Sequence, residues 1–164
     1  MYVKYMFYLA HPLLLRDSVS TMQLKTYSDH ALRVLMQAAL RHPNRVTVDE
    51  VADTYGISRH HLVKIVHNLG RHGYLETHRG VGGGFTLGRR PDEIRLGEIV
   101  RFGEGIDTVI DCYDAENRAC KLFPACRLKG VLDEAAAAFF SVLDDYTLAD
   151  LVKRPAKMRK ALGM

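Results

Sequence analysis

Apolar residues recur at helical spacing in five stretches of the chain. The first stretch opens at Ser28 and Asp29, whose short polar side chains can cap the free amide groups at the start of a helix. In the last and most regular stretch, leucine, alanine and phenylalanine residues share one face of a long helix. The pattern predicts helices at residues 28–42, 48–55, 58–71, 94–102 and 128–145.

Two short segments, 74–78 and 85–87, have the composition of strands. Four of the five residues at 80–84 are glycines, which adopt backbone conformations closed to other residues. This glycine run lacks the Lys-Ser/Thr ending and the strand-to-helix setting of a nucleotide-binding loop. The sequence therefore predicts a β-hairpin with a glycine-rich tip directly after the third helix.

The segment 48–71 meets the packing requirements of a helix-turn-helix. Ala52 is small where the two helices approach each other, and Gly56 stands where the turn needs a left-handed backbone. On the third helix, Leu62, Ile65, Val66 and Leu69 fall on one side, and polar residues fall on the other. Any exposed helix would show such a polar face, but a glycine-tipped hairpin directly after it is typical of a winged helix-turn-helix. The predicted fold is mainly α with a small β-wing.

The polar face of the third helix and the hairpin contain the candidate DNA contacts. A recognition helix enters the major groove with its N-terminal part leading, where arginine reads guanine and lysine mostly binds phosphate. At the hairpin, glycines let the backbone approach the sugar–phosphate chain, and a basic side chain at its base can enter the minor groove. A loose hairpin turn without DNA contact is the alternative. The candidate DNA-contacting residues are Ser58, Arg59, His60, Lys64, Arg79 and Gly83.

Length and charge add limits to this interpretation. The 164 residues suit one compact domain or a small domain with an arm, and the net charge of +4 permits a polyanionic partner without requiring one. No stretch approaches the roughly 20 apolar residues that cross a bilayer, so no membrane partner is expected. Residues 1–21 are interpreted as an extension upstream of a domain that opens at Met22, with a weak signal peptide as the alternative.

All three cysteines of the chain, Cys112, Cys120 and Cys126, fall in one short segment with the spacing C-x7-C-x5-C. An odd number of thiols cannot close fully into intramolecular disulfides, which favours a reducing, cytoplasmic setting. Three thiolates in one loop can ligate three irons of a four-iron cluster or part of a two-iron cluster. Neither gap matches the two-residue spacing of structural zinc sites. The spacing alone leaves an iron–sulfur cluster, zinc, a thiol switch and inert cysteines open.

Several motifs, in order, resemble the NsrR/IscR family of iron–sulfur winged-helix repressors. They are Met22-Gln23-Leu24-Lys25 with Asp29 and Ala31-Leu32-Arg33, Tyr55-Gly56-Ile57-Ser58, Leu62-Val63-Lys64-Ile65, and Arg79-Gly80 leading to Gly83-Gly84. The segments 124–129 and 145–151 are similar to the nitric-oxide-sensing branch of that family. The resemblance covers residues 22–152. IscR-like members carry a histidine shortly after the third cysteine, which is absent here, and the seven-residue first gap is longer than in several members.

The resemblance implies a homodimer formed through the long helix at about 128–145. It also implies a cluster, 4Fe-4S with 2Fe-2S as the alternative, held by the three cysteines and by a carboxylate from the partner subunit. The matching position for that carboxylate is Asp29, for which a helix cap is a second, compatible role. The predicted domains are a winged helix-turn-helix at 22–90, a cluster-binding region at 91–127, and a dimerisation helix and C-terminal segment at 128–152. Residues 153–164 form a basic tail, which is expected to be frayed because residues 153–160 include five basic side chains.

The implied function is a nitric-oxide-sensitive repressor. Such a dimer would bind palindromic, double-stranded operator DNA while its cluster is intact and release the DNA on cluster nitrosylation. A regulator of the same fold that senses iron–sulfur cluster supply or thiol oxidation is the main alternative, and an adaptor that only dimerises is another. An enzyme is not expected, because the sequence shows no paired carboxylates, nucleophile–base arrangement or cofactor loop.

Overall fold

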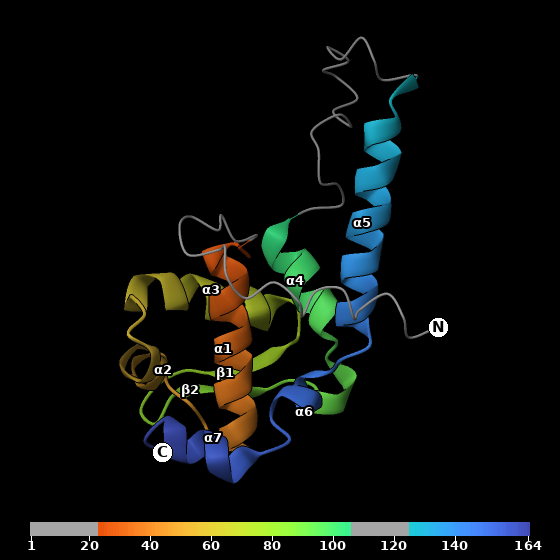
Figure 1. The fold of residues 1–164 in the computed structure, drawn as a ribbon. Coiled ribbons are helices and arrows are strands. Elements are labelled where there is room, and N and C mark those ends of the chain that lie inside the picture. Colours follow the sequence, from red (N-terminus) through yellow and green to blue (C-terminus); the bar gives the residue numbers. More distant parts are fainter. Residues whose placement is uncertain (1–22, 106–124) are drawn as a thin grey trace, which may run out of the picture.

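The computed structural model describes residues 23–105 and 125–164, which form a mainly helical fold with one small sheet (Figure 1). Residues 1–21, Cys112 and Cys120 lie outside the described residues. The described helices are α1 (Thr26–Arg41), α2 (Val48–Tyr55), α3 (Arg59–Arg71), α4 (Leu96–Glu104), α5 (Arg127–Asp144), α6 (Leu148–Leu151) and α7 (Pro155–Ala161). Strands β1 (Leu75–His78) and β2 (Gly84–Leu87) pair antiparallel, and a 3-10 turn spans Pro91–Glu93. The predicted mainly α fold with a small β-wing is confirmed.

Helix α1 is the centre of the core, and α3 and α4 pack on it. Its residues Ala31, Val34 and Leu35 are fully buried. Burying a side chain of this size contributes about 1.5–3 kcal/mol for valine or leucine. Because α1 touches both the helix-turn-helix and α4, it connects the two parts of the chain in which the sequence places its candidate sites.

The turn between α2 and α3 has the predicted geometry. Helix α2 begins with a capping box, in which the Glu50 amide donates to Thr47 Oγ1 at 3.1 Å and the Thr47 amide donates to Glu50 Oε2 at 2.7 Å. It ends at Gly56, whose φ of 64° is left-handed, as the sequence predicts. The predicted apolar side of α3 is buried, which turns its polar side outward.

The predicted start of the first helix is wrong. Helix α1 begins at Thr26, with Lys25 at its N-cap, so neither Ser28 nor Asp29 caps it. Ser28 is fully buried and donates its hydroxyl to Glu104, which lies at the end of α4. The same carboxylate accepts the backbone amide of Lys25 at 2.8 Å. A distant acidic residue thus supplies the acceptor that a local cap would have provided.

The basic tail is not frayed, contrary to the prediction. Residues after α6 form the short helix α7, which lies against the C-terminal end of α1 (Figure 1). There Arg159 donates two hydrogen bonds, of 2.9 and 2.6 Å, to the carbonyl oxygen of Leu40. The last carbonyl groups of a helix lack partners within the helix, and a guanidinium group satisfies one of them here.

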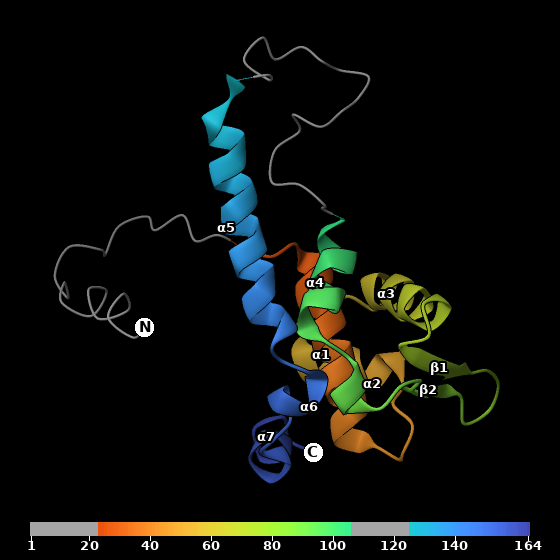
Figure 2. The same cartoon turned by 90° about the vertical axis from the view of Figure 1, so that its right-hand side faces the viewer.

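Helix α5 is fastened to the rest of the described chain near its C-terminal end and extends well beyond it (Figures 1 and 2). Asp144 accepts two hydrogen bonds from Arg101 of α4, at 2.8 and 2.6 Å, and its carbonyl oxygen accepts one from Arg95 at 2.6 Å. The Arg101 guanidinium also lies over the ring of Phe140, 4.4 Å from its centre. No residue of α5 is fully buried. None of the helices described is long and apolar enough to cross a membrane.

Candidate nucleic-acid interface

The outward face of α3 presents the predicted DNA-contacting residues together. Ser58 is the N-cap of α3 and makes no capping bond with its side chain, so its hydroxyl is not committed to the helix. Arg59, His60 and Lys64 follow on the first two turns, and all are exposed. In Figure 2, α3 and the β-hairpin lie on the same side of the molecule, which is the side away from α5. This arrangement puts both candidate contact elements on one face.

Arg59 is held by an acidic residue of the preceding helix. Its Nε donates to Asp49 Oδ1 at 2.5 Å, and about two thirds of each side chain is exposed. A surface ion pair of this kind is worth at most about 1 kcal/mol. Asp49 therefore orients the guanidinium at the leading end of α3 while leaving it able to exchange this carboxylate for a base edge or a phosphate.

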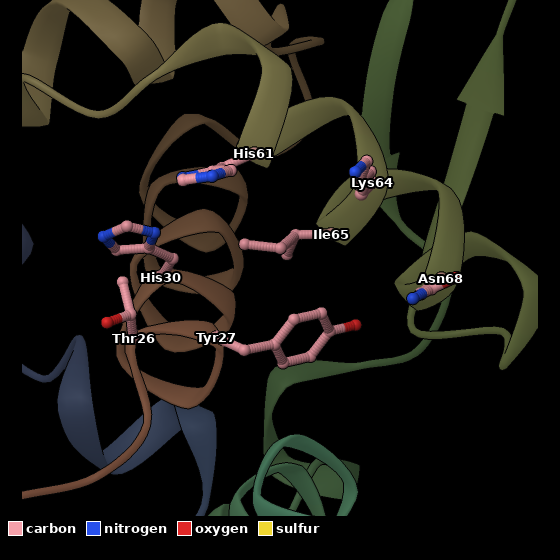
Figure 3. Close-up of a pocket in the computed structure, with 7 residues that line it drawn as sticks. All are labelled: Thr26, Tyr27, His30, His61, Lys64, Ile65 and Asn68. Carbon is pink, nitrogen blue, oxygen red and sulfur yellow. The ribbon is translucent and has the colours of Figure 1, made fainter.

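Lys64 lies on the flank of α3 that faces α1. There it lines a pocket of about 310 Å³ between the first turns of α1 and α3, together with His30 and His61 (Figure 3). Figure 3 shows the rings of His30 and His61 close to each other on one side of this pocket. Burial lowers the pKa of His30, and the positive charge of Arg33 adds to that effect while Asp29 opposes it. Lys64 thus lines this pocket while it stays exposed at the surface.

Two further residues of this face were missed from the sequence. Val63 is 45% exposed on the outward side of α3, one turn after Arg59. An apolar side chain there can contact the methyl group of thymine in the major groove. Arg45 donates to the carbonyl oxygen of Gly82 at 3.0 Å and so supports the hairpin tip. Two features of the sequence could have indicated these residues. Val63 is an apolar residue within a polar helix face, and Arg45 is a basic residue just before the second helix.

The hairpin is a wing whose tip requires glycine. The amide of Gly83 donates to the carbonyl oxygen of Gly80 at 2.9 Å. A Cβ atom at Gly83 would lie 2.8 Å from that oxygen and 2.8 Å from the carbonyl oxygen of His78, closer than any real side chain approaches. Gly83 is therefore needed to fold the tip, and its contact with DNA stays a prediction. Arg79 is exposed at the start of the tip, and its contact with the minor groove also stays a prediction.

A short extended segment before α2 ties the wing to the core, which the sequence did not indicate. Val46 is fully buried, and its amide and carbonyl groups pair with those of Phe85 at 2.9 and 2.8 Å. Gly84, next to Phe85, has a φ of 144°, and a Cβ atom there would lie 2.6 Å from the Val46 oxygen. The wing is thus held at its base by backbone pairing on both sides of β2.

Of the predicted metal ligands, Cys126 and Asp29 lie in the described part of the chain. Cys126 is a free, half-buried thiol at the N-cap of α5. Asp29 lies in the first turn of α1, with its side chain 47% exposed and paired with Arg33 at 2.9 Å. In both views the start of α5 stands well away from the first turn of α1 (Figures 1 and 2). The two candidate ligands of one chain are therefore not brought together, and the described residues contain no group of three metal-binding side chains.

These two residues fit the chemistry of an iron–sulfur ligand set. A thiol that is not oxidised to a disulfide can bind iron as a thiolate. The Asp29 carboxylate is occupied only by a surface ion pair, which is weak enough to be replaced by a metal. About half of the Asp29 side chain is exposed, so its carboxylate is accessible from outside its own chain.

The α2–turn–α3 unit, the glycine-tipped wing and the Val46 segment together define a winged helix-turn-helix protein of the kind that binds double-stranded DNA. The family described as Rrf2, iron-dependent transcriptional regulators, matches residues 24–154. The chain belongs to the Rrf2 family, so it is a DNA-binding transcriptional regulator and not an enzyme, as predicted.

Similar proteins agree with this assignment. The HTH-type transcriptional regulator NsrR of Bacillus subtilis is 44% identical over 144 residues, which cover 87% of this chain and 99% of that protein. NsrR of Geobacillus kaustophilus is 45% identical over 142 residues, or 86% of this chain and 97% of that protein. Among solved structures, CymR, the global cysteine regulator of B. subtilis, matches with a TM-score of 0.63 at 27% identity, covering 81% of this chain and 98% of that one. The predicted resemblance to NsrR regulators is confirmed.

Proposed function

We propose that the protein is a nitric-oxide-sensitive transcriptional repressor. It binds palindromic operator DNA as a homodimer while an iron–sulfur cluster, 4Fe-4S with 2Fe-2S as the alternative, is intact. The placement of Cys126 carries this proposal. It stands at the free end of α5, away from Asp29 of its own chain. A ligand set that includes both Cys126 and Asp29 therefore needs two chains. Identity of 40–45% with NsrR regulators over most of the chain supports the nitric-oxide signal.

An exposed apolar stripe along α5 supports the homodimer. Every third or fourth residue on one side of this helix is apolar and exposed, with Leu128 at 61%, Val131 at 59% and Val142 at 54%. Ala135 and Ala138 lie between them on the same side and are exposed as well. The spacing is that of a helix–helix contact, and the small alanine side chains let two backbones approach closely. The same stripe of a second copy is the partner that we propose.

The mechanism follows from how the chain connects its two candidate sites. When bound, the cluster supplies iron that reacts with nitric oxide. Cys112, Cys120 and Cys126 hold it in one subunit, and Asp29 of the partner subunit completes the ligand set. Asp29 belongs to α1, which packs on α3, so its attachment fixes the recognition helix of the second subunit. Two recognition helices held about 34 Å apart match one turn of DNA. Release of Asp29 removes that restraint, and operator affinity falls.

Anaerobic purification tests the proposal. The expected protein is brown, contains iron and sulfide, and binds an operator duplex about 100-fold more tightly than metal-free protein, which corresponds to about 3 kcal/mol. Nitric oxide should bleach it and release the duplex. Replacing all three cysteines with serine should abolish both the colour and the response. Colourless protein that binds the operator equally well and ignores nitric oxide would refute the proposal.

Asp29→Asn tests the shared site, with Asp92→Asn as its matched control. Both aspartates are about half exposed and paired with an arginine, but Asp92 lies outside α1, on the 3-10 turn before α4. Only Asp29→Asn should lower cluster retention.

Treatment with an oxidant in place of nitric oxide separates a nitric-oxide sensor from a sensor of thiol oxidation. A sensor of thiol oxidation would respond to the oxidant without iron.

A further inference from the structure

Helix α4 ends in a buried carboxylate. Glu104 is its last residue and is only 8% exposed. Its Oε1 atom accepts the Ser28 hydroxyl at 2.5 Å and the backbone amide of Lys25 at 2.8 Å. Ser28 is itself fully buried. Carboxylates are rarely buried unless hydrogen bonds replace their hydration, so this group is held at a defined place.

A third hydrogen bond joins Glu104 to the start of α1. Lys25 returns a hydrogen bond from its Nζ atom to the carbonyl oxygen of Glu104, so the residue is held by its backbone and its side chain. Lys25 is the N-cap of α1 and offers no capping side chain of its own. The positive end of the helix dipole favours a carboxylate at this place. Glu104 therefore serves as a cap for α1 that comes from another helix.

The neighbouring residue shows how closely the two helices approach. A Cβ atom at Gly103 would overlap the Ser28 hydroxyl and would lie 2.9 Å from Ser28 Cα. Only glycine permits this approach. One residue after Glu104, Gly105 ends α4 with a left-handed φ of 62°, and the segment that contains Cys112 and Cys120 begins there. The point at which the chain leaves α4 toward its cysteines is therefore fixed against α1.

Three consecutive residues in the first turn of α1 face three different parts of the proposed assembly. Tyr27 packs edge-to-face on Phe102 of α4, with ring centres 5.9 Å apart, and lines the pocket shared with α3. Ser28 holds Glu104. Asp29 is turned outward, where it is available to a second chain. One helical turn thus touches the start of the cysteine segment of its own chain, the recognition helix, and the proposed ligand position for the partner.

We propose that Glu104 is a positioning residue that transmits the signal from the cysteines to the DNA-binding helix. Through Ser28 and Lys25 it locks the start of the cysteine segment to the first turn of α1. A change at the cysteines therefore moves α1 and, with it, the recognition helix α3 that packs on α1. The inference rests on the proposed function. It assigns to Glu104 a role in transmission and none in holding the cluster.

The test compares Glu104→Ala, which removes the lock, with Glu104→Gln, which keeps an acceptor oxygen. Glu98→Gln is the matched control, since Glu98 lies on the same helix but is about 42% exposed and pairs with Arg89. For each protein, operator affinity is measured with the cluster loaded and after its removal, and iron content is measured alongside. The lock predicts that Glu104→Ala retains its iron while the roughly 100-fold affinity ratio proposed above falls below about fivefold. Glu104→Gln should recover most of the ratio, and Glu98→Gln should keep all of it.

Three results would overturn the inference. These are an unchanged ratio in Glu104→Ala, a loss of iron in that variant, or an equal loss of affinity in both states with a lower melting temperature. If Glu104→Ala does not fold, Ser28→Ala decides, because it removes one hydroxyl and should lower the ratio while iron is retained. A wild-type ratio near one would instead refute the proposed function.

Discussion

Two glycines of the wing both have backbone angles that side-chain-bearing residues rarely adopt, but they differ in the space around them. Gly82 and Gly84 both have positive φ values, 73° and 144°. A Cβ atom at Gly82 meets nothing within 4 Å, whereas one at Gly84 would lie 2.6 Å from the Val46 carbonyl oxygen. Replacing Gly82 with alanine therefore tests a strained backbone angle alone, whereas replacing Gly84 tests a strained backbone angle together with lost room.

The expected magnitudes follow from that difference. Gly82→Ala should cost about 1–2 kcal/mol, the usual penalty for a side chain in left-handed backbone. Gly84→Ala should cost about 1–2 kcal/mol for its own strained backbone angle. It should also displace the pairing of Val46 with Phe85, two backbone hydrogen bonds worth about 1 kcal/mol each. The sum is about 3–4 kcal/mol. For a chain of this size, each kcal/mol corresponds to about 3–4 °C, so Gly84→Ala should melt about 10 °C below the wild type.

Thermal melting followed by circular dichroism, at one protein concentration, measures this difference. Operator affinity provides the second measurement, since a displaced wing should weaken binding more in Gly84→Ala than in Gly82→Ala. Equal melting temperatures for the two variants would show that the close approach to Val46 does not hold the wing.

Three further changes test other parts of the molecule. The Arg101 guanidinium lowers the pKa of Asp144 below its usual 3.8, so this ion pair stabilises the fold above that pH and loses its effect as the pH falls through the lowered pKa. Asp144→Asn should therefore shift the urea midpoint at pH 7 but much less at pH 2, and equal shifts at the two pH values would contradict this. If Val63 contacts a thymine methyl group, deoxyuridine at one operator position should weaken wild-type binding about fourfold, from about 0.8 kcal/mol per methyl, and should leave the binding of Val63→Ala unchanged. Equal losses in the two proteins would exclude the contact. Arg159→Met removes the two hydrogen bonds to Leu40 and should lower the free energy of unfolding by about 1–2 kcal/mol in a urea titration, whereas an unchanged midpoint would mean that α7 adds nothing to the fold.

Local features of the chain could be predicted from the sequence because short-range spacing determines them. The bounds of α2, the left-handed Gly56 and the buried side of α3 all follow from periodicity and from the freedom of glycine. The features that were missed depend on residues far apart in the chain. The start of α1 is set by Glu104, and the tail is held by Arg159, and neither interaction leaves a local signal.

The candidate site also has parts that could be predicted from the sequence and parts that could not. Arg59 and His60 could be placed on the outward face of α3 by counting residues along a helix. That Asp49 holds Arg59, and that Val46 secures the wing, could not be predicted, because both depend on how separate elements meet. The ligand roles of Cys112, Cys120, Cys126 and Asp29 stay predictions that rest on spacing and family resemblance.

Helix α5 works as a lever. Its 18 residues span about 27 Å, and its firm attachment, at Asp144, is at the end opposite Cys126. A rotation of only about 5° at that attachment displaces the Cys126 end by about 2 Å, close to the length of a metal–thiolate bond at about 2.3 Å. Arg95 and Arg101, which bind Asp144, thus influence the position of the Cys126 sulfur from the opposite end of the helix. A substitution of either arginine would displace the Cys126 end of α5 without changing any residue near it.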